Sequence, residues 1–461
     1  MIPFIFNFFI IVVVFSILII VHELGHFFAA RLFGVKVTDF SIGFGPALFK
    51  KKIRQTNLSV CLFPLGGYIK MAGDNRSESR GYRDEFFSKS PGIRSGIVFA
   101  GPLFNYILAF LFLIIIATVG FPVQDTIVGA VENGSPAQEA GIQPGDKLVA
   151  VNDKKVETWS QLKKEIYQAE ASVDISLERN NEKIQLNVPV VEEEMTDQLG
   201  RTTKVSQIGI MLYKPVIGEV IEQYPAEEAG IKKGDQILEV DGEKIENWQD
   251  LAENIQGSKE AVELKIKRGK EVFSLKVPVK KEEVEGFKSG QEYISVIGIR
   301  PPSNEKILKT AFPGSLLKGA DMLFKTTLLS VKGLWYMITD PSISFRESIA
   351  GPIYISYIIS KTAQHGLVAL LQLISLLSIF LFIINLLPIP VFDGGHIVFF
   401  GIEKLKGSPL SQKTEDAATR VGLALIMVLM FFVFYNDIVK RGPKIWKEIK
   451  SSFNQESNEK N

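Results

Sequence analysis

The stretch that decides the fold runs from residue 4 to residue 26 and reads FIFNFFIIVVVFSILIIVHELGH. Residues 4–21 carry no charge, and their length is close to the roughly 20 apolar residues that a membrane-spanning helix needs. The run ends in His22, Glu23 and His26, and ionisable groups at such a place are costly unless they have a function. The stretch therefore predicts a membrane helix with a functional site at its end. A signal peptide is the alternative, but neither a basic segment nor a small-residue cleavage site flanks the stretch.

The ionisable cluster has the spacing of a metal site. Residues four apart share one face of a helix, so His22 and His26 can bind one ion together, with Glu23 beside them. Zinc suits imidazole nitrogens, and a catalytic zinc site has three protein ligands and one open position. We expect Zn²⁺ as the cofactor and Glu23 as the general base. The alternative is a pair of ordinary interfacial histidines, but the chain has only four histidines.

Three more apolar stretches predict a four-span α-helical membrane protein. They lie between Arg94 and Asp125, over residues 367–392 and over residues 421–436, the last being short for a span. The net charge of +1 argues against a nucleic-acid partner. The single cysteine, Cys61, excludes a disulfide within the chain.

Basic residues after the first span indicate its orientation. Loops rich in Lys and Arg stay in the cytoplasm, so this loop is expected inside, with the His-Glu-His cluster near the cytoplasmic side. Residues 121–366 are then expected outside, although a basic tail after residue 436 runs against this orientation. The basic residues of the loop are Arg31, Lys36, Lys50, Lys51, Lys52, Arg54, Lys70, Arg76, Arg80, Arg83, Lys89 and Arg94.

The expected external region contains an internal repeat. Residues 135–146 read SPAQEAGIQPGD, and residues 224–235, 89 positions later, read YPAEEAGIKKGD. Trp159 and Trp248 obey the same offset, and alternating strand-like segments follow each copy. The pattern resembles bacterial PDZ domains, which implies two external α/β domains that capture a peptide or a free C-terminus at a sheet edge. The alternative is a pair of spacers without a ligand. Residues 301–366 are amphipathic, which fits either surface helices or a packed linker.

A third metal ligand is expected from the third span. This span runs in the same direction as the first and ends at Asp393, so both polar groups lie at a similar depth. His396 is a rival ligand or an outer partner of the site. The alternative for residues 393–395 is a simple Asp-Gly-Gly turn that ends a helix.

Several motifs together resemble the site-2 protease family of intramembrane metalloproteases. They are HELGH at residues 22–26, AGPLFN at 100–105, and NLLPIPVFDGGH at 385–396, in which Phe392 stands where the family has Leu. The resemblance implies zinc ligation by His22, His26 and Asp393, with Glu23 as catalytic base. It also implies substrate binding along the third span by Asn385, Pro388 and Pro390, and at a membrane-reentrant β element around Gly67, Tyr68 and Ile69. An ordinary glycine turn is the alternative for that element.

By resemblance, the substrate is the transmembrane segment of a single-pass protein in the bacterial inner membrane. An anti-sigma factor already cut on its outer side is expected, and signal-peptide remnants are a further candidate. A membrane quality-control protease and a non-catalytic PDZ scaffold remain alternatives. We expect domain boundaries as follows: 1–123 for the first two spans and the β loop, 124–205 and 206–300 for the PDZ-like domains, 301–366 for the amphipathic segment, and 367–461 for the last two spans.

Overall fold

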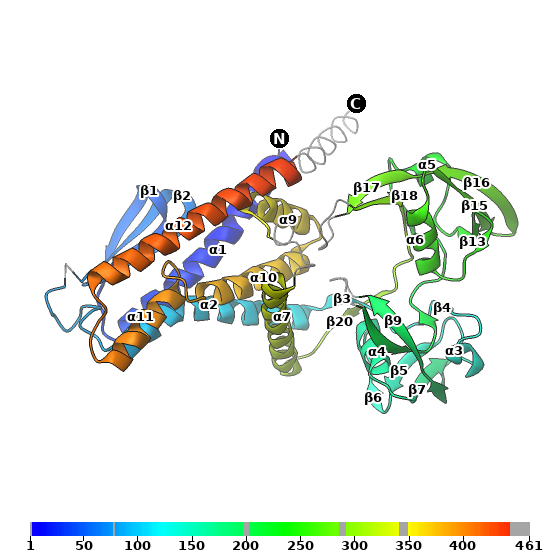
Figure 1. The fold of residues 1–461 in the computed structure, drawn as a ribbon, viewed down its shortest axis with the longest axis horizontal. Coiled ribbons are helices and arrows are strands. Elements are labelled where there is room, and N and C mark those ends of the chain that lie inside the picture. The colour runs from blue at the N-terminus through cyan, green and yellow to red at the C-terminus, as the bar shows by residue number, and fades with distance from the viewer. Residues whose placement is uncertain (1, 77–78, 197–201, 285–291, 341–348, 443–461) are drawn as a thin grey trace. The chain divides into compact units, whose positions relative to one another are not determined.

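The structure is a computed structural model that describes residues 2–76, 79–196, 202–284, 292–340 and 349–442 (Figure 1). Its internal contacts divide the chain into two compact units. The first unit comprises Met1–Gly120, Lys309–Thr339 and Ile349–Asn461, and the second comprises Phe121–Leu308 and Asp340–Ser348.

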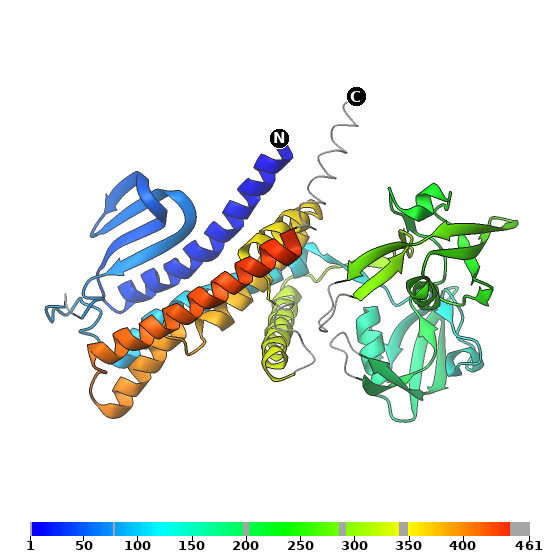
Figure 2. The same ribbon diagram turned by 45° about the horizontal axis from the view of Figure 1, so that its top comes forward.

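Four helices of the first unit are long and apolar enough to cross a membrane, as the sequence predicted. They run in a similar direction in both views (Figures 1 and 2). The last of them starts at residue 412, nine residues before the apolar stretch, so the short fourth span becomes a helix of 25 residues. The helices of this unit are α1 (Ile2–Leu32), α2 (Pro91–Val119), α7 (Gly314–Thr339), α9 (Pro352–Gln364), α10 (Leu367–Asn385), α11 (Asp393–Lys406), α12 (Gln412–Asn436) and the π-helix η1 (Asp437–Arg441).

Helix α2 is the centre of this unit because it contacts α1, α7, α10 and α11. An apolar cluster joins α1 to α9 and α10 through Val14, Leu18, Ile359 and Ile374. Helix α11, which no sequence pattern predicted as a separate helix, follows α10 after a short connector and packs on the N-terminal part of α2. Helix α2 therefore contacts both α1, which carries the HELGH motif, and α11, which begins at Asp393.

A buried carboxylate joins the end of α12 to the start of α9. Asp437 is fully buried, and its two oxygens accept hydrogen bonds from the backbone N–H groups of Gly351, Ile353 and Tyr354, each at 3.1 Å. These N–H groups belong to the first turn of α9, where a helix leaves its donors without partners and favours negative charge. Asp437 therefore caps α9 from a different helix.

A strongly bent hairpin, β1 (Val37–Ile53) and β2 (Thr56–Met71), packs on α1. Residues 39–42 pair with residues 57–60 on one side and with residues 67–70 on the other, so the hairpin folds into several adjacent strand segments. Within the described residues, no other strand pairs with the outer edge of residues 67–71. Among the described strands, this edge therefore has no partner, although its Ile69 N–H faces the Glu23 carboxylate.

The second unit is built from the two copies of the repeat, which fold alike. Each copy has a four-stranded sheet, with the order β6-β5-β7-β8 in the first and β14-β13-β15-β16 in the second. The pair β3 (Phe121–Gln124) and β20 (Glu305–Leu308) joins the two ends of this unit. The first copy contains β4 (Ala130–Val131), α3 (Pro136–Glu139), β5 (Lys147–Val151), β6 (Lys154–Lys155), α4 (Trp159–Tyr167), β7 (Ser172–Arg179), β8 (Glu182–Pro189), β9 (Val191–Thr196), β10 (Thr202–Gln207) and β11 (Ile210–Met211). The second contains β12 (Glu219–Val220), α5 (Pro225–Glu228), β13 (Gln236–Val240), β14 (Glu243–Lys244), α6 (Trp248–Gly257), β15 (Ala261–Arg268), β16 (Glu271–Pro278), β17 (Lys280–Val284), β18 (Glu292–Val296) and β19 (Ile299–Arg300).

The boundary expected between residues 205 and 206 falls inside β10 and needs correction. Strand β10 pairs with β9, and β11 pairs with β4, so both belong to the first copy. Ile208 and Ile210 are buried in the core of that copy. The pattern of the repeat motif did not mark this boundary because these closing strands lie far from the motif in sequence.

The Gly-Asp pair that ends each repeat motif has a structural role. The Arg179 guanidinium donates to both carboxylate oxygens of Asp146 at 2.6 Å, and Arg268 and Asp235 form the same pair in the second copy at 2.7 Å. Burial favours a raised pKa for Asp146, but the hydrogen bonds from Arg179 and from the Gln143 N–H hold the pKa below its ordinary value. The spacing that the two copies share therefore fixes an ion pair with a buried aspartate in each copy.

Acid should destabilise the second unit through these pairs. Because the folded pKa of Asp146 is lowered, the pair stabilises the fold above the ordinary Asp pKa of about 3.9 and loses that contribution as the pH falls through the folded value. Asp146→Asn should cost about 1.5–3 kcal/mol at pH 7 and flatten the loss of stability toward pH 3. Urea unfolding of residues 121–308 at several pH values measures both effects. The exposed Glu182→Gln is the control, and an unchanged pH dependence in Asp146→Asn would contradict the assignment.

Candidate zinc centre

The helical spacing of the HELGH motif brings its two histidines together. His22 and His26 lie one turn apart on α1, and their Nε2 atoms are 3.2 Å apart. Their rings meet edge to face, with centroids 4.8 Å apart. Both imidazoles thus present Nε2 toward one point, as the sequence predicted from residues four apart on a helix.

Asp393 reaches the same point from the other end of the chain. It is the first residue of α11, and its Oδ2 lies 3.2 Å from His22 Nε2 while its Oδ1 lies 3.7 Å from His26 Nε2. The ligand atoms of the three residues all lie within 4.8 Å of one another. Two imidazole nitrogens and one carboxylate are a donor set that suits catalytic zinc.

Two glycines after Asp393 let the first turn of α11 pack closely against the connector that precedes it. A Cβ atom at Gly394 would clash with the Leu386 carbonyl, and one at Gly395 would clash with the Ile389 carbonyl. Residues 393–395 form the first turn of α11, so the alternative interpretation, a turn that ends a helix, is wrong. The start of this helix places the Asp393 carboxylate at the site.

Helix α2 supplies outer partners for both histidines. His26 Nδ1 lies 3.0 Å from the Ile97 carbonyl, and His22 Nδ1 lies 3.4 Å from Asn105 Nδ2. Asn105 is buried, and its Oδ1 has no hydrogen-bond partner among the described residues. A turn of the amide by 180° places Oδ1 at His22 Nδ1, where it accepts the ring N–H and leaves Nε2 free for a metal. The residues therefore fit a zinc ion.

Two glycines allow α1 and α2 to approach closely at this site. A Cβ atom at Gly25 would clash with the Ala100 carbonyl, and one at Gly101 would clash with His26 Nε2 and touch the His22 ring. The motif AGPLFN at residues 100–105 resembled a family motif in the sequence, but no role followed for Gly101 or Asn105. Only the packing of α2 on α1 explains why these two residues stand in the motif.

The side chain of Glu23, on α1, lies beside strand β2. Its carboxylate faces the Ile69 backbone N–H. A Cβ atom at Gly67 would lie 3.5 Å from Glu23 Cγ and 2.9 Å from the Ser41 carbonyl, so only glycine fits there. Tyr68 is 44% exposed and stacks near Phe44, with centroids 6.4 Å apart. Of the three predicted residues of the β element, Gly67 and Ile69 contact the site, and the Tyr68 side chain does not.

The predicted residues of the third span lie at its end. Asn385 is the last residue of α10, and Pro388 and Pro390 lie in the connector to Asp393. A Cβ atom at Gly422 of α12 would lie 3.4 Å from Pro390. This connector thus runs between the site and α12.

His396 stays outside the group of possible metal ligands in the described residues. Its ring lies near Phe399 and Phe400, with centroids 6.3 and 6.5 Å away, and burial lowers its pKa below the ordinary value. The rival ligand assignment therefore has no support in the geometry.

A buried ion pair fixes α11 on α2. Arg94 Nη2 lies 2.5 Å from Glu403 Oε1, and both side chains are largely buried. The Arg94 guanidinium also lies over the Phe400 ring, 4.6 Å from its centroid, and Arg76 approaches Glu403 at 3.4 Å. These contacts hold the helix that carries Asp393.

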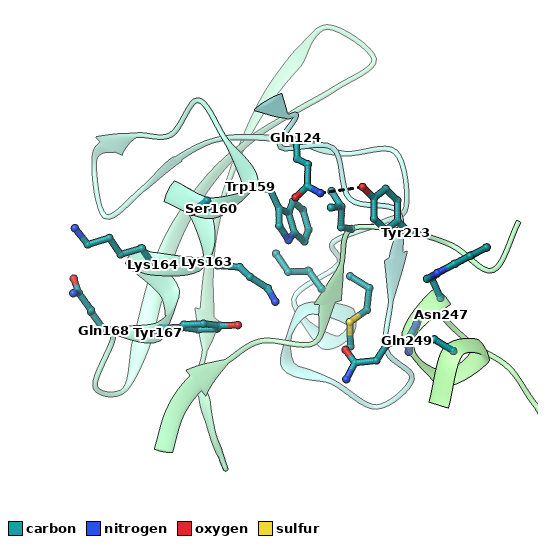
Figure 3. A pocket seen from close by; sticks show the side chains of 15 residues that line it. Gln124, Trp159, Ser160, Lys163, Lys164, Tyr167, Gln168, Tyr213, Asn247 and Gln249 are labelled. Carbon is teal, nitrogen blue, oxygen red and sulfur yellow. Dashed lines mark hydrogen bonds between the residues drawn. The ribbon is translucent and has the colours of Figure 1, made fainter. Parts of the chain in front are cut away.

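The second unit contains its own cavity, of about 830 Å³ (Figure 3). Trp159, Lys163 and Tyr167 of α4 form one side, and residues 210–213 form another. Residues 247–249 at the start of α6 complete the lining, so both copies contribute to it. Gln124 Nε2 donates to the Tyr213 hydroxyl at 3.1 Å across the rim.

Comparison with known proteins identifies the family. The model of peptidase family M50 matches residues 10–429. The regulators of sigma-E protease of Salmonella typhimurium and Escherichia coli are 33% and 32% identical over 445 and 450 residues, covering 92% of this chain and 97% of theirs. A Neisseria meningitidis relative named as a zinc metalloprotease is 33% identical over 93% of this chain and 98% of its own. Among solved structures, a PDZ domain from a Listeria monocytogenes SdrC-like protein is 22% identical over 19% of this chain and 88% of its own, with a TM-score of 0.16. With its apolar helices and this match over most of its length, the chain belongs to peptidase family M50, the site-2 zinc metalloproteases.

Proposed function

We propose that this protein is an intramembrane zinc endopeptidase in which His22, His26 and Asp393 hold the metal and Glu23 is the catalytic base. One observation carries the proposal: two imidazole nitrogens and a carboxylate from opposite ends of the chain converge within 4.8 Å, next to a glutamate. The site lies on an apolar helix that is long enough to span a membrane. A structural zinc site is usually closed by four protein ligands, and the described residues gather three.

The chain's own residues divide the work of hydrolysis. Zinc, when bound, polarises a carbonyl and acidifies water. Glu23 would take the proton from the attacking water and return it to the leaving amine, with its carboxylate oriented by the Ile69 N–H. Ile97 and Asn105 would fix the two histidines in the tautomer that leaves Nε2 free.

The substrate class follows from where the site lies. A transmembrane helix hides its peptide bonds in internal hydrogen bonds, and an unwound segment needs new partners because lipid offers none. The outer edge of residues 67–71, beside Glu23, would pair with the unwound substrate as an added strand. Asn385, Pro388 and Pro390 would line the opposite side of the substrate. The β1–β2 hairpin would then be the membrane-reentrant element, consistent with exposed apolar side chains such as Phe44, Leu48 and Phe49.

The relatives suggest the biological substrate. Several are named regulator of sigma-E protease, so we infer that this chain cleaves an anti-sigma factor in the inner membrane after a first external cut. Signal-peptide remnants are a second class of single-pass substrate. The basic loop after α1 supports an active site near the cytoplasmic side and a second unit in the periplasm. The shared motif and sheet order support two PDZ-like domains there, and the 830 Å³ cavity is the candidate peptide site.

Removing zinc tests this function directly. The purified protein should cut a single-pass substrate within its membrane segment, lose activity with a chelator and regain it with added Zn²⁺. Because Asn105 supports His22, Asn105→Ala should lose zinc at roughly tenfold lower chelator concentration. Mass spectrometry of the products and metal analysis measure these effects. Cleavage that continues in a metal-free sample would refute the proposal.

A further inference from the structure

A hollow of about 390 Å³ opens at the end of α1, within the first unit. Its wall is formed by the last turn of α1, by residues 34–37 and by the turn between β1 and β2. The Lys36 N–H donates to the Asp84 carbonyl at 2.9 Å, which closes one side. Nothing in the proposed proteolysis uses this hollow.

The hollow carries an excess of positive charge. Arg31, Lys36 and Arg54 line it, against one acidic residue, Asp84. None of the three basic side chains has a carboxylate oxygen within 4.0 Å in the part of the chain that the structure describes. Arg31 is held in place by the Phe27 ring, 4.7 Å from its centroid, and by a long hydrogen bond of 3.4 Å to Thr56. Three unpaired cations around one concavity favour an anion.

The surroundings of the hollow identify the kind of anion. Leu32, next to Arg31, is 81% exposed, and Ile53, next to Arg54, is 44% exposed. The hollow also lies where the apolar helix α1 ends, which is the depth of lipid headgroups for a spanning helix. A ligand with an anionic head and apolar chains matches both features, whereas a free anion matches only the first.

We propose that this hollow binds the phosphate-bearing headgroup of an anionic phospholipid. The guanidinium groups of Arg31 and Arg54 contact the phosphate, and Lys36 adds a point charge. The acyl chains lie along Leu32 and Ile53. A bound lipid connects the turn between β1 and β2 to the end of α1, and so steadies the hairpin that carries residues 67–71 beside Glu23.

A matched pair of charge variants tests the site in the full-length protein in neutral detergent. The site variant is Arg31→Gln/Lys36→Gln/Arg54→Gln. The control is Lys50→Gln/Lys51→Gln/Lys52→Gln, which removes the same charge from exposed positions of β1 outside the hollow. Each protein is titrated with phosphatidylglycerol, with phosphatidylcholine and with inorganic phosphate. Native mass spectrometry counts the lipid retained, and the thermal unfolding midpoint reports stabilisation.

Each basic side chain near an anionic lipid strengthens binding roughly fivefold, so the site variant should bind phosphatidylglycerol about a hundredfold more weakly. Wild type should retain phosphatidylglycerol far better than phosphatidylcholine, and the lysine control should bind like wild type. Arg54→Gln alone, in an exposed turn, should give a partial loss and guards against misfolding of the triple variant. Equal binding of the two lipids, equal losses in control and site variant, or equal stabilisation by inorganic phosphate would each overturn the proposal.

Discussion

Glu23→Gln should leave zinc bound and slow cleavage of a transmembrane substrate by roughly 10²–10⁴-fold. Glutamine has nearly the shape of glutamate but cannot take a proton from water at neutral pH. The proposed metal-binding group is separate from Glu23, because it consists of His22, His26 and Asp393. Replacing the base should therefore remove activity but keep zinc, whereas replacing a metal ligand should remove both.

Zinc content and cleavage rate should be measured on the same purified samples. Asp416→Asn, an exposed change in α12 that also removes one carboxylate, is the control and should cut like wild type. Residual cleavage close to the wild-type rate in Glu23→Gln would rule out Glu23 as the base. Loss of zinc together with activity would instead assign Glu23 a role in holding the metal.

Gly101→Ala should abolish zinc binding and cleavage together. A Cβ atom at this position would clash with His26 Nε2 and touch His22, so the histidines or the two helices must move apart. The helix itself gains from this substitution, since alanine favours a helix by up to about 1 kcal/mol over glycine. Any loss of function therefore reports the close approach of α2 to the metal site and not a weakened helix.

Gly92→Ala on the same helix is a matched control. A Cβ atom at Gly92 would meet no other atom within 4 Å, so this change should retain zinc and activity. We expect zinc in Gly101→Ala to fall to a small fraction of one ion per chain, measured by metal analysis, while circular dichroism shows the helices intact. Full zinc content in Gly101→Ala would show that the site tolerates a wider helix spacing than the structure has.

The second prediction depends on α2, a span whose sequence carried a family motif but no predicted site residue. Its N-terminal half supplies the Ile97 carbonyl, Gly101 and Asn105 to the site, and its Arg94 holds α11 through Glu403. The two helices that carry the predicted ligands therefore meet through a third. Substitutions on α2 should affect zinc binding although no α2 side chain belongs to the metal-binding group.

The sequence by itself determined the local features of this protein. Uncharged runs of suitable length predicted four spanning helices, because a chain inside lipid has few alternatives to a helix. The spacing of His22 and His26 predicted a shared face, since residues four apart on a helix are neighbours whatever the rest of the chain does. The 89-residue repeat predicted two alike α/β copies, and the two sheets have the same strand order.

The tertiary structure alone decided everything that joins distant segments. Asp393 was expected from topology and resemblance, but only the packing of α1, α2 and α11 brings its oxygen within 3.2 Å of His22. The closing strands β10 and β11, the free edge of residues 67–71 and the cationic hollow likewise have no local signature. Periodicity records which face of an element is buried, but it does not record the partner against which that face packs. The candidate zinc centre is therefore partly local and partly tertiary. Its histidine pair follows from the spacing on α1, whereas the Asp393 carboxylate and helix α2 reach it only through the fold.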